Sequence, residues 1–147
     1  MTEGVRGADC VMCHALETAG SDESLVVHVA PLSFVVMNLY PYNSGHVMVA
    51  PRRHVGTLQA ATPEELAEMM ALARRLEEVA AEVYHPDGAN LGLNLGRAAG
   101  AGVADHIHLH FVPRWAGDTN FMTVAGDTRV IPEDPREACR RLRPYFA

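Results

Sequence analysis

The stretch DHIHLHFVPRW, residues 105–115, places a histidine at every second position: His106, His108 and His110. Because alternate side chains of a β-strand point to opposite faces, a strand over residues 105–113 would gather the three imidazoles on one face. Imidazole is a nucleophile, a proton carrier and a metal ligand near neutral pH. One such histidine is usually just a hydrogen-bonded side chain, but three in register favour a chemical site, with a three-histidine metal site as the alternative.

The segments on the N-terminal side of this stretch predict strands and one long helix. Residues 25–29, 33–39 and 46–50 are rich in β-branched side chains and predict strands, with a turn at 41–45. Thr62-Pro63-Glu64-Glu65 is typical of a helix start, with a capping threonine, a proline at the first helical position and a capping-box glutamate. An apolar stripe at helical spacing then predicts a buried face about six turns long: Leu66, Met69, Met70, Ala73, Leu76, Val79, Ala80 and Val83.

The remaining segments complete an α+β pattern. We expect a strand over residues 90–95, a glycine- and alanine-rich loop over 96–102, a short strand near 122–124 and a helix within 134–143. No repeat, low-complexity tract or long charge run divides the chain, so residues 1–147 are predicted to form a single domain.

Composition limits the partners that the chain can have. Hydrophobic residues make up 48%, charged residues 20% and the net charge is −6, which is ordinary for a soluble protein and gives no basic field for nucleic acid. The apolar runs are too short to cross a bilayer, and the polar N-terminus does not resemble a signal peptide. We therefore expect a cytoplasmic protein.

Cys10, Cys13 and Cys139 are an odd number of cysteines, which argues against a disulfide framework. The Cys10-x-x-Cys13 pair favours a metal site over a thioredoxin-like redox role, because no strand-like run precedes it. Cys139 lies among apolar residues of the C-terminal helix and is predicted to be a small buried hydrophobe.

The complete motif over residues 106–112 resembles the signature of the histidine triad (HIT) superfamily, His-φ-His-φ-His-φ-φ with φ apolar. Residues 38–46 and the run Pro51-Arg-Arg-His54 are similar to the family's segments before its long helix, and the likeness covers about residues 10–125, with a C-terminal helical tail at 132–147. Residues 94–102 and 113–121 resemble the bacterial branch that includes diadenosine tetraphosphate phosphorylases. The resemblance implies a HIT-like α+β fold: an antiparallel sheet of about five strands, one long helix and a short C-terminal helix.

In that family the middle histidine, here His108, attacks the α-phosphorus of a nucleotide and forms a nucleotidyl-histidine intermediate. One ring nitrogen must then be free while the other donates to a fixed acceptor, which we expect to be the backbone carbonyl of His106. His110 would donate to a nonbridging phosphate oxygen, with a structural hydrogen bond as the alternative. The resemblance thus implies catalytic roles for His106, His108 and His110.

Substrate contacts are expected outside the triad. Asn38 stands where the family contacts ribose, although a strand-end turn residue is the alternative. The glycine-rich loop could bring backbone N–H groups close to phosphate, with Asn94, Arg97 and Gly102 as the expected contacts, although such loops are often simple turns. Trp115, just beyond the triad strand, is the fifth expected contact.

Zinc-bearing relatives combine a C-x-x-C pair with two later histidines, which implies a structural zinc held by Cys10, Cys13, His54 and His106. His14 is a possible competitor for one position. His28 and His85 are expected at the surface, whereas His46 matches a family position but could be structural. No organic cofactor is expected, and the resemblance implies a homodimer.

The resemblance implies an enzyme that cleaves dinucleoside polyphosphates such as diadenosine tetraphosphate at the α-phosphate, by hydrolysis or phosphorolysis. Residues 100–104 lack the Ser, Thr or Gln that hydrolytic branches often carry before the triad, which leans toward the phosphorylase-like branch. The alternatives are a nucleoside phosphoramidate hydrolase, a metal-dependent hydrolase that uses the histidines as ligands, and a non-catalytic nucleotide-binding module.

Overall fold

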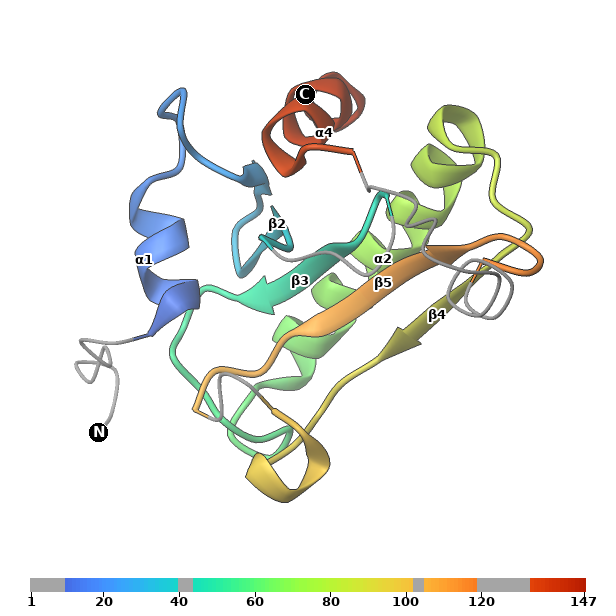
Figure 1. The fold of residues 1–147 in the computed structure, drawn as a ribbon. Helices are drawn as coiled ribbons and strands as arrows, with labels where there is room; N and C mark the ends of the chain where they lie inside the picture. The colour runs from blue at the N-terminus through green and yellow to red at the C-terminus, as the bar shows by residue number, and fades with distance from the viewer. Residues whose placement is uncertain (1–9, 40–43, 102–104, 119–132) are drawn as a thin grey trace.

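The computed structural model describes residues 10–39, 44–101, 105–118 and 133–147. Its sheet has the strand order β1-β2-β3-β5-β4, and every neighbouring pair is antiparallel (Figure 1). The strands are β1 (Val26–Val29), β2 (Ser33–Met37), β3 (Val47–Pro51), β4 (Gly88–Gly92) and β5 (Leu109–Arg114). The predicted α+β class and five-stranded sheet are therefore confirmed, while the strand expected near residues 122–124 lies outside the described residues.

The helices are α1 (Val11–Glu17), α2 (Pro63–Val83) and α4 (Pro135–Leu142), with 3₁₀ turns at η1 (Arg97–Ala99) and η2 (Arg143–Phe146). The predicted capping box of α2 is confirmed: Thr62 Oγ1 accepts from the Glu65 backbone at 3.0 Å, and Glu65 Oε1 accepts from the Thr62 backbone at 2.8 Å. In the part of the chain that the structure describes, no helix is both long and apolar enough to span a bilayer.

The two faces of the sheet pack against different helices. Val35, Met37, Val47, Val49, Leu109 and Phe111 share one cluster with the buried faces of α2 and α4. The alternate residues Phe34, Val36, Met48 and Ala50 pack instead against Met12 and the two cysteines at the start of α1. The period of two along each strand therefore separates a helix-packed core from a second face, and His110 lies on that second face because it pairs with Met48.

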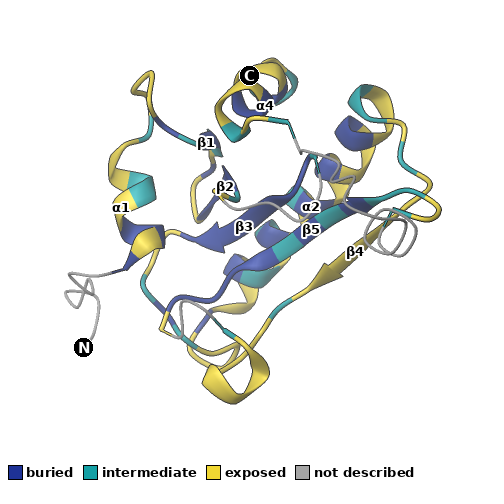
Figure 2. Cartoon of the chain, in the orientation of Figure 1, coloured by how far each residue is buried: buried dark blue, intermediate teal, exposed yellow. Residues whose placement is uncertain are grey.

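Three local predictions differ from the structure. Helix α1 was not predicted, since its seven residues are too few to show a helical period. Met70 was expected in the buried stripe of α2 but is 58% exposed, because it lies at the edge of that stripe. The strand expected at 90–95 occupies residues 88–92, and all five of its residues are exposed (Figure 2).

Candidate active site and metal centre

The histidine strand begins later than its sequence pattern predicts. β5 starts at Leu109, so His106 and His108 lie in the segment before it and only His110 lies within the strand. That segment is held by separate contacts, including a 2.8 Å bond from the Ile107 backbone to the Val55 carbonyl, rather than by a continuous ladder. The three imidazoles consequently do not form one uniform row, because His106 takes part in a different cluster from the other two.

His108 presents one ring nitrogen to a fixed backbone acceptor. Its Nδ1 lies 3.0 Å from the carbonyl oxygen of His106, so Nδ1 carries the proton and donates. Nε2 of the neutral ring then holds the free lone pair. The hydrogen bond expected from the sequence is therefore confirmed, and it gives the buried His108, only 7% exposed, the tautomer that a nucleophile at Nε2 requires.

His110 is paired with a fourth histidine, His46. Nε2 of His46 lies 2.9 Å from Nδ1 of His110 and 3.2 Å from the amide nitrogen of Asn38. With the Asn38 amide nitrogen as a donor, Nε2 of His46 accepts, and its single lone pair is shared between the Asn38 amide and Nδ1–H of His110. The His110 ring also meets His108 edge to face, with ring centroids 4.8 Å apart. This contact links His46, His110 and His108 into one continuous group.

Burial keeps the rings of His46 and His110 neutral near neutral pH. Desolvation lowers the pKa of His46 to about 4, helped by the nearby rings of His110 and His108, and His46 is fully buried. The pKa of His110 is also lowered, first by burial and then by His108. Near neutral pH an uncharged His46 can therefore accept from His110, which fixes the orientation of the His110 ring.

Gly45 determines the backbone conformation immediately before His46. Gly45 has φ of +79°, and a Cβ atom there would lie 3.0 Å from both Pro113 and Tyr84. Any other residue would therefore be strained and crowded at this position. Of the turn expected over residues 41–45, the described part is Ser44 and Gly45, and this glycine lets His46 enter the sheet next to β5.

Among the described residues, nothing covers the sheet on the far side of His110. The cross-strand neighbour of His110 on β4 is Gly92, and no atom of those residues lies within 4 Å of the position where its Cβ would be. Helix α1 covers the β2 and β3 part of this face, whereas β5 and β4 lie away from α1 (Figure 1). The β4 side of the sheet next to His110 is therefore uncovered in the part of the chain that the structure describes.

Beside the triad lies a compact group of metal-binding side chains. Cys10, Cys13, His54 and His106 each offer one ligand atom, and these atoms all lie within 4.8 Å of one another. Nδ1 of His106 lies 3.3 Å from Cys10 Sγ and 3.6 Å from Cys13 Sγ, while Nδ1 of His54 lies 3.4 Å from Cys13 Sγ. The structure thus brings together the four residues expected to bind zinc, and His14 is exposed and outside the group.

The geometry of these donors fits a tetrahedral ion. Zn–S bonds of about 2.3 Å and Zn–N bonds of about 2.0 Å put sulfur and nitrogen ligands about 3.5 Å apart, close to the distances observed here. Nε2 of His106 donates to the Pro51 carbonyl at 2.8 Å, which leaves the lone pair on Nδ1 facing the sulfurs. Cys10 also caps α1, where its Sγ accepts from the Cys13 backbone at 3.3 Å, and such a bond stabilises a thiolate. The donor set, tautomer and burial all suit a closed metal site.

The other expected substrate contacts lie at different places. Asn38 is at the site, next to His46, whereas Asn94 and Arg97 are exposed on the loop after β4. Trp115 follows the far end of β5, which at about 3.3 Å per residue puts it about 20 Å along the strand from His108. Gly102 lies outside the described residues. Binding roles for these residues remain predictions.

The isolated histidines and the third cysteine have ordinary roles. His85 is exposed, as expected, while His28 is half-buried and stacks on Phe146 at 5.5 Å between ring centroids. Cys139 is 1% exposed and belongs to the core, which confirms its predicted role. Sequence reasoning left His46 undecided between a family position and a structural role, and its match to the family position was the signal for its part in the site.

Comparison with known proteins agrees with this geometry. The HIT domain model matches residues 19–117, so the chain belongs to the HIT domain family. It is 47% identical over 126 residues to the AP-4-A phosphorylase of Mycobacterium tuberculosis, which covers 86% of this chain and 65% of that relative. It is 36% identical over 95 residues to an asymmetrical bis(5'-nucleosyl)-tetraphosphatase of Schizosaccharomyces pombe, covering 65% of this chain and 52% of that protein.

A solved structure matches across nearly the whole chain. A zinc-bound histidine triad family protein from Mycobacterium smegmatis is similar with a TM-score of 0.72 and 31% identity, covering 93% of this chain and 92% of that one. By contrast, the matched region spans only about 65% of the length of the Mycobacterium tuberculosis relative.

Proposed function

We propose that the protein is a nucleotidyl transferase that cleaves dinucleoside polyphosphates at the α-phosphate, with His108 as the nucleophile. The observation that carries this proposal is the 3.0 Å bond from His108 Nδ1 to the His106 carbonyl, which leaves the Nε2 lone pair for attack. In the first step a bond forms between Nε2 and the α-phosphorus, and the bridging P–O bond breaks with its electron pair leaving on the departing nucleotide. A second acceptor then displaces the histidine and restores the neutral ring.

His110 is proposed to stabilise the charge that develops on phosphorus. The negative charge of a bound polyphosphate favours the protonated form of His110, whose Nε2–H can then donate to a nonbridging oxygen. Its other nitrogen is held by His46, 2.9 Å away, so the ring is oriented before substrate binds. Asn38, Asn94, Arg97, Gly102 and Trp115 are proposed as substrate-binding residues, and Asn38 is the one in contact with this histidine group.

The acceptor in the second step is proposed to be inorganic phosphate. This choice is supported by the name of the Mycobacterium tuberculosis relative and by the lack of Ser, Thr or Gln at residues 100–104. Diadenosine tetraphosphate would then yield ATP and ADP only when phosphate is supplied, whereas hydrolysis would give ATP and AMP without it. Product analysis by ion-exchange chromatography, with and without phosphate, separates the two.

Trapping the intermediate tests the proposal as a whole. Mixing the protein with radiolabelled diadenosine tetraphosphate and quenching within one turnover should leave label on the wild-type chain, and none on the His108→Asn variant. Tight binding of diadenosine tetraphosphate without label or product would favour a non-catalytic nucleotide-binding module. Turnover of a nucleoside phosphoramidate, but not of diadenosine tetraphosphate, would favour a nucleoside phosphoramidate hydrolase. Retained turnover in the variant would refute the nucleophile assignment.

We also propose that Cys10, Cys13, His54 and His106 hold a structural zinc ion. Two thiolates and two imidazoles make a closed tetrahedral set, which gives the ion a structural role and no direct part in the reaction. The zinc-bound neighbour from Mycobacterium smegmatis supports this choice of metal. When bound, the ion would join the start of α1 to the segments that carry His54 and His106.

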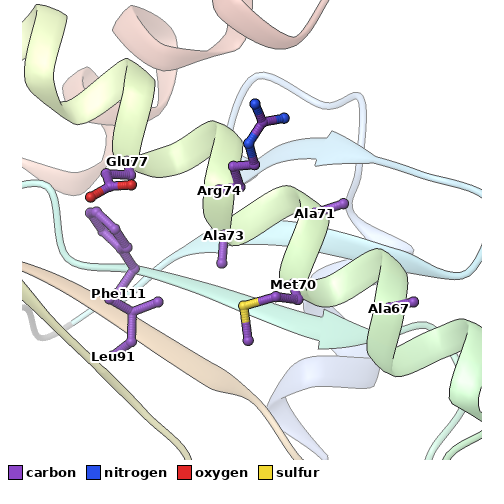
Figure 3. Close-up of a pocket in the computed structure, with 8 residues that line it drawn as sticks. All are labelled: Ala67, Met70, Ala71, Ala73, Arg74, Glu77, Leu91 and Phe111. Carbon is purple, nitrogen blue, oxygen red and sulfur yellow. The ribbon is translucent and has the colours of Figure 1, made fainter.

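A homodimer is proposed to form over α2 and β4. A groove of about 590 Å³ lies between them, lined on the helix by Ala67, Met70 and Ala71 and on the sheet by Leu91 and Phe111 (Figure 3). Arg74 and Glu77 line the same groove, so a second copy related by two-fold symmetry could pair these opposite charges across the contact. β4 is an edge strand with all five residues exposed, which is a surface that folded proteins usually cover.

A further inference from the structure

The segment between β3 and α2 carries two parts of the metal centre and is fixed by an ion pair whose carboxylate is buried. Residues 51–56 supply the His54 ring as one ligand and the Pro51 carbonyl that accepts from His106. Between these two residues stands Arg53, whose side chain extends to the first turn of α2 rather than to the metal ligands. The segment is therefore attached both to the metal centre and to the long helix.

The partner of Arg53 is an unusually buried carboxylate. Glu65 is 2% exposed and receives two bonds from Arg53, from Nε at 2.9 Å and from Nη2 at 2.7 Å. It also accepts from the Thr62 backbone at 2.8 Å. The hydrogen bonds from Arg53, followed by that from Thr62, keep the pKa of Glu65 below its ordinary value despite burial. A carboxylate that is this buried and this fully bonded fixes Arg53 in one orientation.

The neighbouring residues make contacts of a different kind. Arg52, next in the chain, is exposed and donates to the carbonyls of Ala30 and Pro31 in the turn between β1 and β2. Glu68, one turn along α2 from Glu65, accepts from Leu32 and Ser33 in the same β1–β2 turn. Both residues tie nearby elements together without attaching residues 53–56 to α2, so they are matched controls for Arg53 and Glu65.

We propose that Arg53 and Glu65 are positioning residues for the metal centre, an inference that rests on the proposed zinc site. The ion pair holds residues 51–56 against α2, so that His54 presents Nδ1 to Cys13 and Pro51 presents its carbonyl to His106. Partners hydrogen-bonded directly to metal ligands typically change metal affinity by about 10- to 100-fold when they are removed, and we expect a loss of that order for this pair, which acts through residues 51–56. The pair thus sets how firmly the site holds its metal.

The test is metal binding by the full chain, measured with Zn²⁺ against a chromophoric chelator and with Co²⁺ by visible absorption. Arg53→Ala and Glu65→Gln are expected to weaken Zn²⁺ binding by about 10- to 100-fold, and to shift the Co²⁺ spectrum toward that of the His54→Ala variant. The control variants Arg52→Ala and Glu68→Gln should keep a Zn²⁺ affinity and a Co²⁺ spectrum close to those of the wild type. If Arg53→Ala or Glu65→Gln fails to fold, Arg53→Lys is tested in its place. This variant keeps the positive charge on a half-exposed side chain but removes the paired N–H groups that bond Glu65.

The outcomes separate this inference from the zinc proposal. If the wild-type chain binds no metal, the proposed zinc site fails and the inference fails with it. If wild type binds one metal that is lost in Cys13→Ser, yet the Arg53 and Glu65 variants bind like their Arg52 and Glu68 controls, the positioning role alone is overturned. Equal weakening in all four variants would also overturn it, because the effect would then follow general stability.

Discussion

Nε2 of His46 lies 2.9 Å from Nδ1 of His110, and His46 is completely buried behind it. A hydrogen bond between two imidazole rings needs a proton on one nitrogen and a lone pair on the other. Protonation of His46 at Nε2 would make that nitrogen a donor, and His110 could then accept only by moving its own proton from Nδ1 to Nε2. A neutral His46 therefore holds His110 with its proton on Nδ1.

Stability should consequently depend on pH through His46. Its pKa is about 4 in the folded chain and about 6.5 when unfolded, so the unfolded state binds more protons between these values. The free energy of unfolding should fall as the pH drops from about 6.5 to about 4, with a contribution from His46 on the order of 3 kcal/mol. Chemical denaturation across this range should show a smaller decline in His46→Gln, whereas His85→Gln, at an exposed position, should decline like wild type.

Removing the His108 ring should abolish turnover without unfolding the chain. His108→Asn is expected to lower kcat by about 10³-fold or more, because covalent catalysis has no comparable bypass. Steady-state assays with diadenosine tetraphosphate measure the loss, and circular dichroism checks the fold. His85→Asn is the matched control, and equal activity in the two variants would contradict a nucleophilic role.

Loss of one thiolate should destabilise the N-terminal part of the fold. Cys10→Ser removes a proposed metal ligand and the cap of α1, and we expect the free energy of unfolding to fall by about 3 kcal/mol or more in the presence of Zn²⁺. Elemental analysis should find about one zinc per wild-type chain and little in the variant. Cys139→Ala, in the core away from the ligands, should keep its zinc, and zinc retained by Cys10→Ser would argue against the site.

A charge at the α2 and β4 groove should break the proposed dimer. Leu91 is 47% exposed there, and Leu91→Asp is expected to raise the dimer Kd by about 100-fold or more, since an aspartate would be buried without a partner. Sedimentation velocity over a concentration series measures the change. Leu58→Asp, at a 39% exposed leucine that does not line the groove, serves as the control, and an unchanged dimer in Leu91→Asp would place the contact elsewhere.

The sequence was sufficient where local chemistry decides structure. The capping box at Thr62 and the period of α2 predicted that helix, and the resemblance to zinc-bearing relatives implied the group of Cys10, Cys13, His54 and His106 that the fold brings together. These predictions held because a cap or a family motif specifies its own geometry.

The sequence was insufficient where tertiary packing decides the structure. Helix α1 is short, and its stability comes from the Cys10 cap and from contacts with β2 and β3, neither of which leaves a periodic signal. The burial of His46 depends on how β3 pairs with β5, and the exposure of Met70 depends on what covers α2. Periodicity identifies a face of an element but not its partner across space.

His106 joins the two centres through different parts of one residue: its ring faces the cysteines, while its carbonyl receives the proton-bearing nitrogen of His108. Loss of activity in a His106 variant would therefore have two possible causes. The variant could lack a metal ligand, or the His108 ring could be wrongly oriented, and an activity assay does not distinguish the two. Mutational surveys of this chain should rank that position as doubly constrained, and should assign chemical roles only from substitutions that disturb one centre at a time.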